Sequence, residues 1–153
     1  MEPLAKLQKY VQEAENLYNR LVLVVGPPGS GKSKLLRQLE GVKIVNINKE
    51  LTRELVNIPQ EDMSIKTQEL LSQIVSSYSE QVLVLDNIEL LFLPDLELDP
   101  LKAFEHLSRN KTLVVAWTGH FDGNKLVWAE PDHPEYRVYT DKSCPDKIVQ
   151  LIG

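Results

Sequence analysis

Hydrophobic residues follow two patterns along the chain, a helical spacing at the beginning and short continuous runs later. Over residues 2–19 they recur every three to four positions, and polar residues fill most of the positions between them. The recurring residues are Leu4, Leu7, Val11, Ala14 and Tyr18. This spacing predicts an amphipathic helix that covers one face of a sheet, or alternatively docks on a partner.

Three continuous apolar runs rich in valine follow this helix: Leu21–Val25, Val82–Leu85 and Leu113–Trp117. Such runs are typical of strands that are buried on both faces, as in a parallel sheet between layers of helices. Val42–Ile47 is a fourth predicted strand. Val138–Thr140, with Leu126–Ala129 beside it, supplies a fifth.

Helical segments are predicted between these strands and at the end of the chain. They are Ser33–Glu40, Ser64–Glu80, a helix from Pro100 to Arg109 capped by Asp99, and Ile148–Ile152. The alternation of strands and helices predicts a three-layer α/β fold with a mostly parallel five-stranded sheet. The stretch Thr118–Glu135, which contains two glycines and two prolines, receives no assignment.

Composition and charge narrow the class of protein. The 153 residues suit a single domain, with residues 1–19 as the N-terminal helix and 20–153 as the core. The longest apolar runs have five residues, too few to span a membrane. A net charge of −5 disfavours a free-standing nucleic-acid binder, so we expect DNA contact only indirectly or through an assembly. The single cysteine, Cys144, fits a cytoplasmic location.

One motif lies directly after the first predicted strand and opens the next helix. Residues 26–33, GPPGSGKS, match the phosphate-loop pattern G-x-x-x-x-G-K-[ST]. In such a loop, backbone N–H groups form a nest for anions, the lysine reaches the β- and γ-phosphates, and the final hydroxyl ligates Mg²⁺. The expected nucleotide-binding residues are Gly26, Pro27, Pro28, Gly29, Ser30, Gly31, Lys32, Ser33 and Lys34.

Polar residues after a later strand are candidates for the chemistry of the bound nucleotide. Asp86 follows the apolar run Val82–Leu85, and we expect it to hold Mg²⁺ together with Ser33. The next residue, Asn87, can orient a water molecule but cannot take its proton. Glu89 can take that proton if the chain turns sharply here, and a solvated carboxylate is the alternative.

Thr118 directly follows the strand Leu113–Trp117, where it can contact the γ-phosphate or the attacking water. An ordinary turn is the alternative, and the nearby His120 is more typical of a solvated loop residue. A trans-acting arginine accelerates many reactions of this kind. Among the five arginines, Arg109 and Arg137 adjoin predicted strands, so either is a candidate to face a neighbouring subunit, with surface pairing as the alternative.

The phosphate loop, Asp86 and Thr118 together resemble the nucleotide core of the AAA+ and STAND ATPases over about Leu17–Thr140. This resemblance implies ATP and Mg²⁺ as cofactors and the sheet order 5-1-4-3-2. The sequence departs from that pattern in two places. Asp141–Gly153 is too short for a C-terminal lid domain, and Asn87 stands where a second acidic residue is usual.

At the scale of the whole chain, the sequence is similar to the BrxF family, small P-loop proteins of type 3 bacteriophage-exclusion (BREX) systems. The similarity is carried by Leu21–Leu36, Leu83–Glu89 and Ala129–Arg137. It implies a role in bacterial antiviral defence beside a larger AAA+ ATPase, a DNA methyltransferase and an alkaline-phosphatase-like protein. Assembly as a homo-oligomer is a further expectation.

These features predict an ATP-binding P-loop NTPase whose hydrolysis is slow or stimulated by a partner. A binding module that uses ATP without turnover is the alternative, because Asn87 replaces the acid. A small-molecule kinase is less well supported, because such enzymes close arginines over the phosphates, and Leu51–Glu80 offers only Arg53. A GTPase is disfavoured, because Asn48-Lys49-Glu50 is followed by Leu51 in place of the aspartate that reads guanine.

Overall fold

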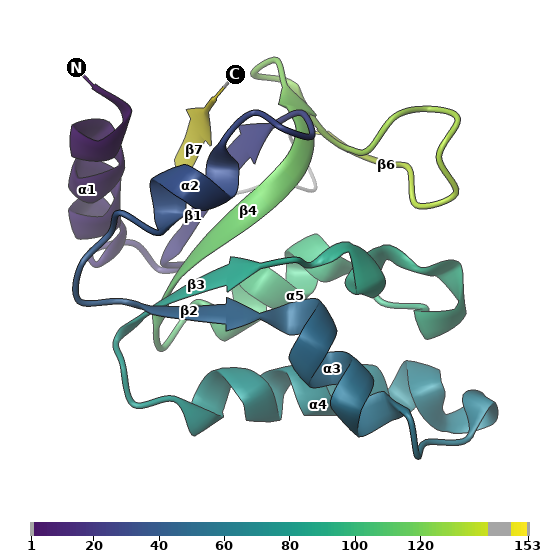
Figure 1. Cartoon of the computed structure of the whole chain (residues 1–153). Coiled ribbons are helices and arrows are strands. Elements are labelled where there is room, and N and C mark those ends of the chain that lie inside the picture. The colour runs from purple at the N-terminus through teal and green to yellow at the C-terminus, as the bar shows by residue number, and fades with distance from the viewer. Residues whose placement is uncertain (1, 141–147, 153) are drawn as a thin grey trace.

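Helices and strands alternate along the part of the chain that the computed structural model describes, residues 2–140 and 148–152 (Figure 1). The strands are β1 (Leu21–Gly26), β2 (Lys43–Asn46), β3 (Val82–Asp86), β4 (Thr112–Phe121), β5 (Lys125–Trp128), β6 (Arg137–Thr140) and β7 (Ile148–Leu151). The α-helices are α1 (Pro3–Ala14), α2 (Lys32–Leu36), α3 (Ile47–Leu55), α4 (Met63–Ser77) and α5 (Pro100–Leu107). Short 3-10 helices are η1 (Gln60–Asp62), η2 (Glu89–Phe92) and η3 (Pro94–Leu96). Within these residues, no helix has the length and hydrophobicity to cross a membrane.

Five strands form a parallel sheet in the order β2-β3-β4-β1-β7. This is the 5-1-4-3-2 order that the AAA+ and STAND resemblance implies, with β7 in the position of the fifth strand. β5 and β6 continue from β4 as antiparallel strands, so the connected sheet has seven strands within residues 2–140 and 148–152, where the sequence predicted five. The three-layer α/β fold and the mostly parallel sheet are confirmed.

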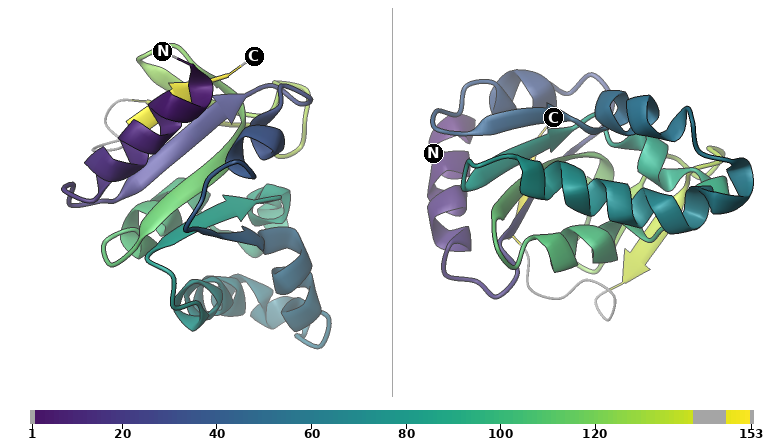
Figure 2. Two further views of the ribbon diagram at one scale, coloured as in Figure 1. Left: turned by 60° about the vertical axis from the view of Figure 1, so that its left-hand side comes forward. Right: turned by 90° about the horizontal axis from the view of Figure 1, so that it is seen from below.

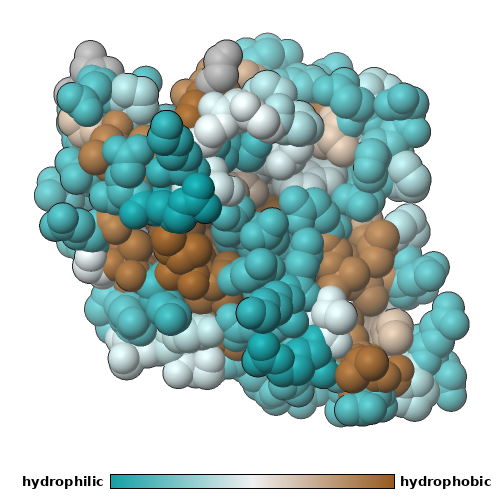
Figure 3. All heavy atoms as spheres, viewed as in Figure 1, coloured by the Kyte–Doolittle hydropathy of each residue, from teal (hydrophilic) through white to brown (hydrophobic). Residues whose placement is uncertain are grey.

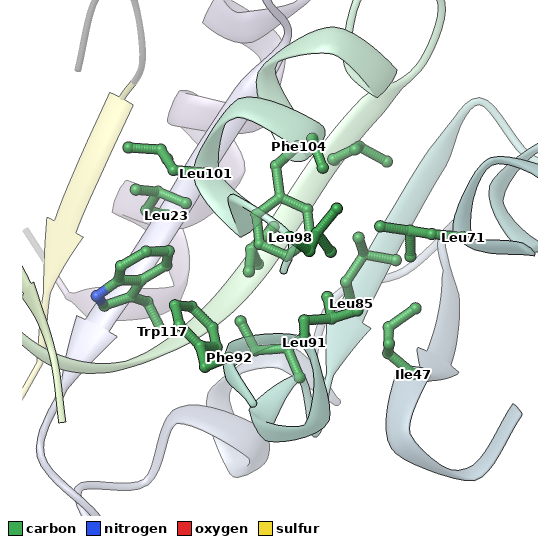
Figure 4. Close-up of a cluster of buried hydrophobic side chains, with 14 of the residues drawn as sticks. Leu23, Ile47, Leu71, Leu85, Leu91, Phe92, Leu98, Leu101, Phe104 and Trp117 are labelled. Atoms are coloured by element: carbon green, nitrogen blue, oxygen red, sulfur yellow. The ribbon is translucent and has the colours of Figure 1, made fainter. Parts of the chain in front are cut away.

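The sheet separates two hydrophobic cores, because successive side chains of a strand point to opposite faces. In β1, Leu21, Leu23 and Val25 belong to the larger core with α3, α4 and α5. Val22 and Val24 belong to the smaller core with α1 and α2. Figure 2 shows helices on both faces of the sheet, and Figure 4 shows part of the larger core. On the face shown in Figure 3, hydrophobic side chains reach the surface in separate patches among hydrophilic ones.

The register of the parallel strands brings the predicted site residues to one edge of the sheet. Gly26 at the end of β1 pairs with Thr118 of β4, and Asp86 at the end of β3 pairs with Asn46 of β2. In open α/β sheets, ligands bind outside the carboxyl ends of the strands. The phosphate loop, Asp86 and Thr118 therefore surround the edge where a ligand is expected.

The end of the chain corrects one prediction: Ile148–Ile152 is not a helix, because Ile148–Leu151 forms strand β7. This strand pairs in parallel with Val22–Val25, and the N–H of Ile152 donates to the Val25 carbonyl at 2.9 Å. Four or five residues cannot easily nucleate a helix, whereas the edge of β1 offers backbone partners for the whole segment.

Val138–Thr140 corrects a second prediction, because it is β6 of the antiparallel hairpin and does not belong to the parallel sheet. Hydrophobic pattern alone does not distinguish the two arrangements, since a short apolar segment fits either. The stretch Thr118–Glu135, for which only Leu126–Ala129 had been predicted as a strand, contains the end of β4 and all of β5.

Helix ends differ from the sequence predictions by a few residues, and one helix was missed. α1 ends at Ala14 where the prediction reached residue 19, and α2 ends at Leu36 where it reached Glu40. The helix capped by Asp99 is confirmed, since its carboxylate accepts the Lys102 N–H at 3.3 Å. Helix α3 had no prediction. Asn46 caps it by accepting the N–H of Lys49 at 3.0 Å.

Candidate nucleotide-binding site

A cavity of about 640 Å³ lies at the carboxyl edge of the sheet and gathers most of the predicted site residues. Its walls include Pro28, Gly29, Ser30, Gly31, Lys32, Ser33, Lys34, Asp86, Asn87, Glu89 and Thr118. Gly26 and Pro27 are not in this wall. They contribute to the site through their carbonyl oxygens, which accept hydrogen bonds from Lys32 Nζ. The fold thus brings together residues that are up to 92 positions apart, from Gly26 to Thr118.

The phosphate loop takes the backbone shape that an anion nest requires. Gly29 and Gly31 have φ values of 75° and 93°, in the left-handed region that glycine adopts at little cost. A Cβ at either position would meet no atom within 4 Å, so backbone conformation rather than space calls for glycine. Because α2 begins at Lys32, the first N–H groups of this helix have no partner within it. These groups are available to phosphate oxygens.

Lys32 is buried, with 8% of its surface exposed, although the loop position suggested an exposed side chain. Its Nζ donates to the carbonyl oxygens of Gly26 at 2.9 Å and Pro27 at 3.0 Å. Burial lowers the pKa of the Lys32 ammonium group, and the charges of Asp86 and Glu89 oppose this change. The ammonium group is therefore hydrogen-bonded within its own loop, in a cavity that both carboxylates also line.

Ser33 and Asp86 form the direct link between the phosphate loop and β3. The Ser33 hydroxyl donates to Oδ2 of Asp86 at 2.8 Å, across 53 positions of sequence. A hydroxyl and a carboxylate are hard oxygen donors, which Mg²⁺ prefers. Within residues 2–140 and 148–152, no three His, Cys, Asp or Glu side chains could hold a metal by themselves. This pair fits Mg²⁺, because that ion takes few protein ligands and completes its shell with phosphates and water.

The chain turns sharply after Asp86, as a role for Glu89 requires. Asn87 has a φ of 52°, and its N–H donates to Oδ1 of Asp86 at 2.9 Å. Asn48, at the start of α3, holds the turn: its N–H donates to the Asn87 carbonyl at 2.8 Å, and its Oδ1 accepts the Leu90 N–H at 2.9 Å. Its Nδ2 donates to Oε2 of Glu89 at 2.7 Å. Sequence reasoning considered Asn48 only as part of a guanine-reading motif and missed this role.

Three other candidates lie outside the cavity. His120 borders a separate hollow of about 320 Å³ with Gly26 and Pro27. The Arg109 guanidinium lies 5.1 Å from the centre of the Tyr18 ring, near the amino end of β4. The Arg137 guanidinium donates to the Leu98 carbonyl at 2.6 Å. Both arginines thus have partners within the chain, and their role toward a neighbouring subunit stays a prediction.

Several residues of the cavity wall were not predicted: Arg37, Trp128, Glu130, His133 and Glu135. Arg37 directly follows α2, four residues after the motif ends at Ser33, and this spacing could have suggested it. The others belong to β5 and the loop before β6; Leu126–Ala129 was predicted as a strand, but nothing in the sequence indicated that this stretch lines the site. Their place in the site depends on the hairpin folding back over the ends of β3 and β4.

An aromatic cluster fixes this hairpin to the parallel sheet. The rings of Phe92 and Trp128 stack with centres 3.9 Å apart, and Trp117 meets both rings edge-on at 5.4 Å. Figure 4 shows Trp117 and Phe92 side by side at the border of the larger core. Tyr139 of β6 donates to Oδ1 of Asp99 at 3.1 Å, and burial raises the pKa of its hydroxyl. The hairpin is therefore held by packing and by hydrogen bonding.

Comparison with known proteins supplies little beyond this geometry. No protein-family model matches the chain, and no curated protein matches it in sequence. Among solved structures, the chain is similar to C. elegans PCH-2, with 15% sequence identity and a TM-score of 0.49. The match covers 98% of this chain and 41% of that chain, so this chain spans about two fifths of the neighbour's length. The assignment of the site therefore depends on the residues described above.

Proposed function

We propose that the chain binds ATP with Mg²⁺ in this cavity and hydrolyses it slowly, as an ATP-dependent switch. The observation that carries the proposal is the 2.8 Å contact between Ser33 and Asp86 below a glycine-rich loop of nest geometry. The residues that such a site needs come from three separate segments and meet at one edge of the sheet. The spacing of residues in the motif does not require that these segments meet, so their meeting is independent support for the motif.

Lys32, Ser33 and Asp86 have defined tasks in this proposal. Lys32 exchanges the carbonyls of Gly26 and Pro27 for phosphate oxygens, and the phosphates then stabilise its charged form. Ser33 and Asp86 hold Mg²⁺, which neutralises charge on the β- and γ-phosphates when it is bound. The backbone N–H groups of the loop orient the phosphate chain.

Glu89 is the residue that we assign to the attacking water. Glu89 lines the cavity together with Lys32 and Asp86, the residues assigned to the phosphates and Mg²⁺. Asn48 binds Oε2, and Oε1 is the oxygen that we assign to accept the water proton. We expect slow turnover, because Asn87 stands directly after Asp86 and cannot take a proton from water.

Replacing Glu89 by glutamine tests this role. Glu89→Gln keeps the size of the side chain and removes its ability to accept a proton, so we expect ATP turnover to fall about 100-fold with unchanged ATP affinity. Phosphate release under saturating Mg-ATP measures the rate, and calorimetric titration with a non-hydrolysable analogue measures affinity. Glu54→Gln, on α3 outside the cavity wall, is the matched control.

The outcomes of these measurements distinguish a hydrolysing site from a site that binds ATP without turnover. An unchanged rate in Glu89→Gln would move the water-orienting role to Asn87 or to a residue of a partner. ATP binding without measurable turnover in the wild type would instead favour a non-hydrolysing assembly module. Absence of nucleotide binding would overturn the proposed function as a whole.

We also propose that the nucleotide state controls assembly, with other copies of the chain or with BREX defence proteins. This proposal is supported by the resemblance to the BrxF family and by the position of loops around the cavity. We expect the solution mass to rise with a non-hydrolysable ATP analogue and to fall as ATP is consumed. Light scattering measures this mass, and Lys32→Ala is the control. A mass that does not change with nucleotide would contradict nucleotide-controlled self-assembly. Co-purification would then test assembly with the defence proteins.

A further inference from the structure

The hairpin β5–β6 supplies a wall of the cavity that the phosphate-loop motif does not provide. The Ala129 N–H donates to the Thr118 carbonyl at 3.0 Å, and the Trp128 ring stacks on Phe92 of η2. Thr118 lies in the second half of β4, and η2, which begins with Glu89, follows β3. In the proposed binding mode these segments face the terminal phosphate. The hairpin wall is thus attached to the phosphate end of the cavity.

His133 organises the loop at the centre of this wall. Its N–H donates to the Glu130 carbonyl at 2.9 Å, and its carbonyl accepts the Tyr136 N–H at 3.1 Å. Its ring nitrogen Nδ1 accepts the backbone N–H of Glu135 at 3.1 Å. One residue therefore closes two successive turns, and the last of these contacts fixes the ring as well as the backbone.

The Nδ1 contact determines which ring nitrogen can donate. A nitrogen that accepts an N–H carries no hydrogen, so the hydrogen of the neutral imidazole lies on Nε2. Two other donors of the wall are occupied: Trp128 Nε1 donates to Oε1 of Glu135 at 3.3 Å, and the Ala129 N–H donates to the Thr118 carbonyl. Carboxylates can only accept. Among the hairpin residues that line the cavity, His133 is therefore the side chain that offers a donor to an anion.

We propose that His133 donates a hydrogen bond from Nε2 to the terminal phosphate of a bound nucleoside triphosphate. The hairpin then distinguishes a triphosphate from a diphosphate, because only the triphosphate reaches this wall. The carboxylates of Glu130 and Glu135 would repel the terminal phosphate if no donor accompanied them. This inference rests on the proposed function and adds to it a residue that selects the nucleotide.

The test compares two nucleotides in three variants. Calorimetric titrations with Mg²⁺ measure the affinities for a non-hydrolysable ATP analogue and for ADP. We expect His133→Ala to lower the affinity for the analogue about ten-fold and to leave that for ADP unchanged, as for loss of one hydrogen bond to a charged group. His133→Gln places an amide N–H near Nε2 and should restore much of the loss. His133→Asn keeps an acceptor near the position of Nδ1 but has no donor at the position of Nε2. We therefore expect that it does not restore the affinity for the analogue.

Three results would contradict parts of this account in distinguishable ways. Equal losses for both nucleotides, with rescue by His133→Asn, would show that His133 only shapes the loop. Unchanged affinity for the analogue in a folded His133→Ala would exclude the contact. A wild-type chain that binds neither nucleotide would overturn the proposed function itself, and thermal unfolding checks that each variant is folded.

Discussion

Lys32→Ala is expected to weaken ATP binding about 100-fold, because it removes charge-assisted hydrogen bonds to two phosphates. Lys32 follows the glycine-rich part of the phosphate loop. In the folded chain its Nζ donates to the carbonyl oxygens of Gly26 and Pro27, which lie in the same loop. Isothermal titration with a non-hydrolysable analogue measures the loss. Lys49→Ala is the matched control, because it removes the same charge from an exposed site outside the cavity wall.

The burial of Lys32 makes an unfolding measurement necessary beside the titration. Removing the side chain leaves two carbonyl groups without its N–H donors, but it also removes an amine whose burial disfavours its charge. We expect these effects to offset one another to within about 1 kcal/mol in the free energy of unfolding. A folded Lys32→Ala that binds ATP as tightly as the wild type would contradict the assignment of the phosphate loop.

Gly119→Ala is expected to destabilise the fold by about 3 kcal/mol, at the upper end of the cost of overpacking. A Cβ at this position would lie 1.8 Å from the Val127 carbonyl oxygen and 2.8 Å from its carbon. Both are backbone atoms of β5, and the same oxygen accepts the Trp117 Nε1 hydrogen bond at 3.0 Å. The hairpin must therefore move away from β4, which disturbs the aromatic cluster. Urea unfolding measures the loss.

Gly123→Ala is the matched control for this substitution. Gly123 also has a positive φ, 97°, but a Cβ there would meet no atom within 4 Å. We expect the control to cost about 1 kcal/mol, from backbone conformation alone. Equal losses in the two variants would contradict the close approach of β4 and β5.

The sequence was most informative where structure depends on neighbouring residues. The phosphate loop is a local motif, and its φ values, its helix and its position after β1 agree with the prediction. The strands β1, β3 and β4 were recognisable because each is a continuous apolar run buried on both faces. The order of the sheet came from a family resemblance, since no hydrophobic pattern encodes which strands become neighbours.

The remaining features depend on contacts between distant segments. Asn48 meets Glu89 across 41 positions, and each residue type is common at surfaces, so nothing local marks the pair. β7 is a strand because β1 has an unpaired edge, and an isolated apolar segment of this length fits a strand or a helix. His133 belongs to the site because Phe92 and Thr118 anchor the hairpin beside it.

Both tryptophans of the chain lie in the aromatic cluster, with ring centres 5.4 Å apart and planes inclined by 86°. Trp117 is fully buried, and Trp128 borders the cavity with 2% of its surface exposed. The intrinsic tryptophan emission of the whole protein therefore arises beside the candidate nucleotide cavity. A spectral change on adding ATP would report on the hairpin, whereas fraying of α1 would leave the emission unchanged. The chain therefore contains an intrinsic fluorescent probe beside the candidate site.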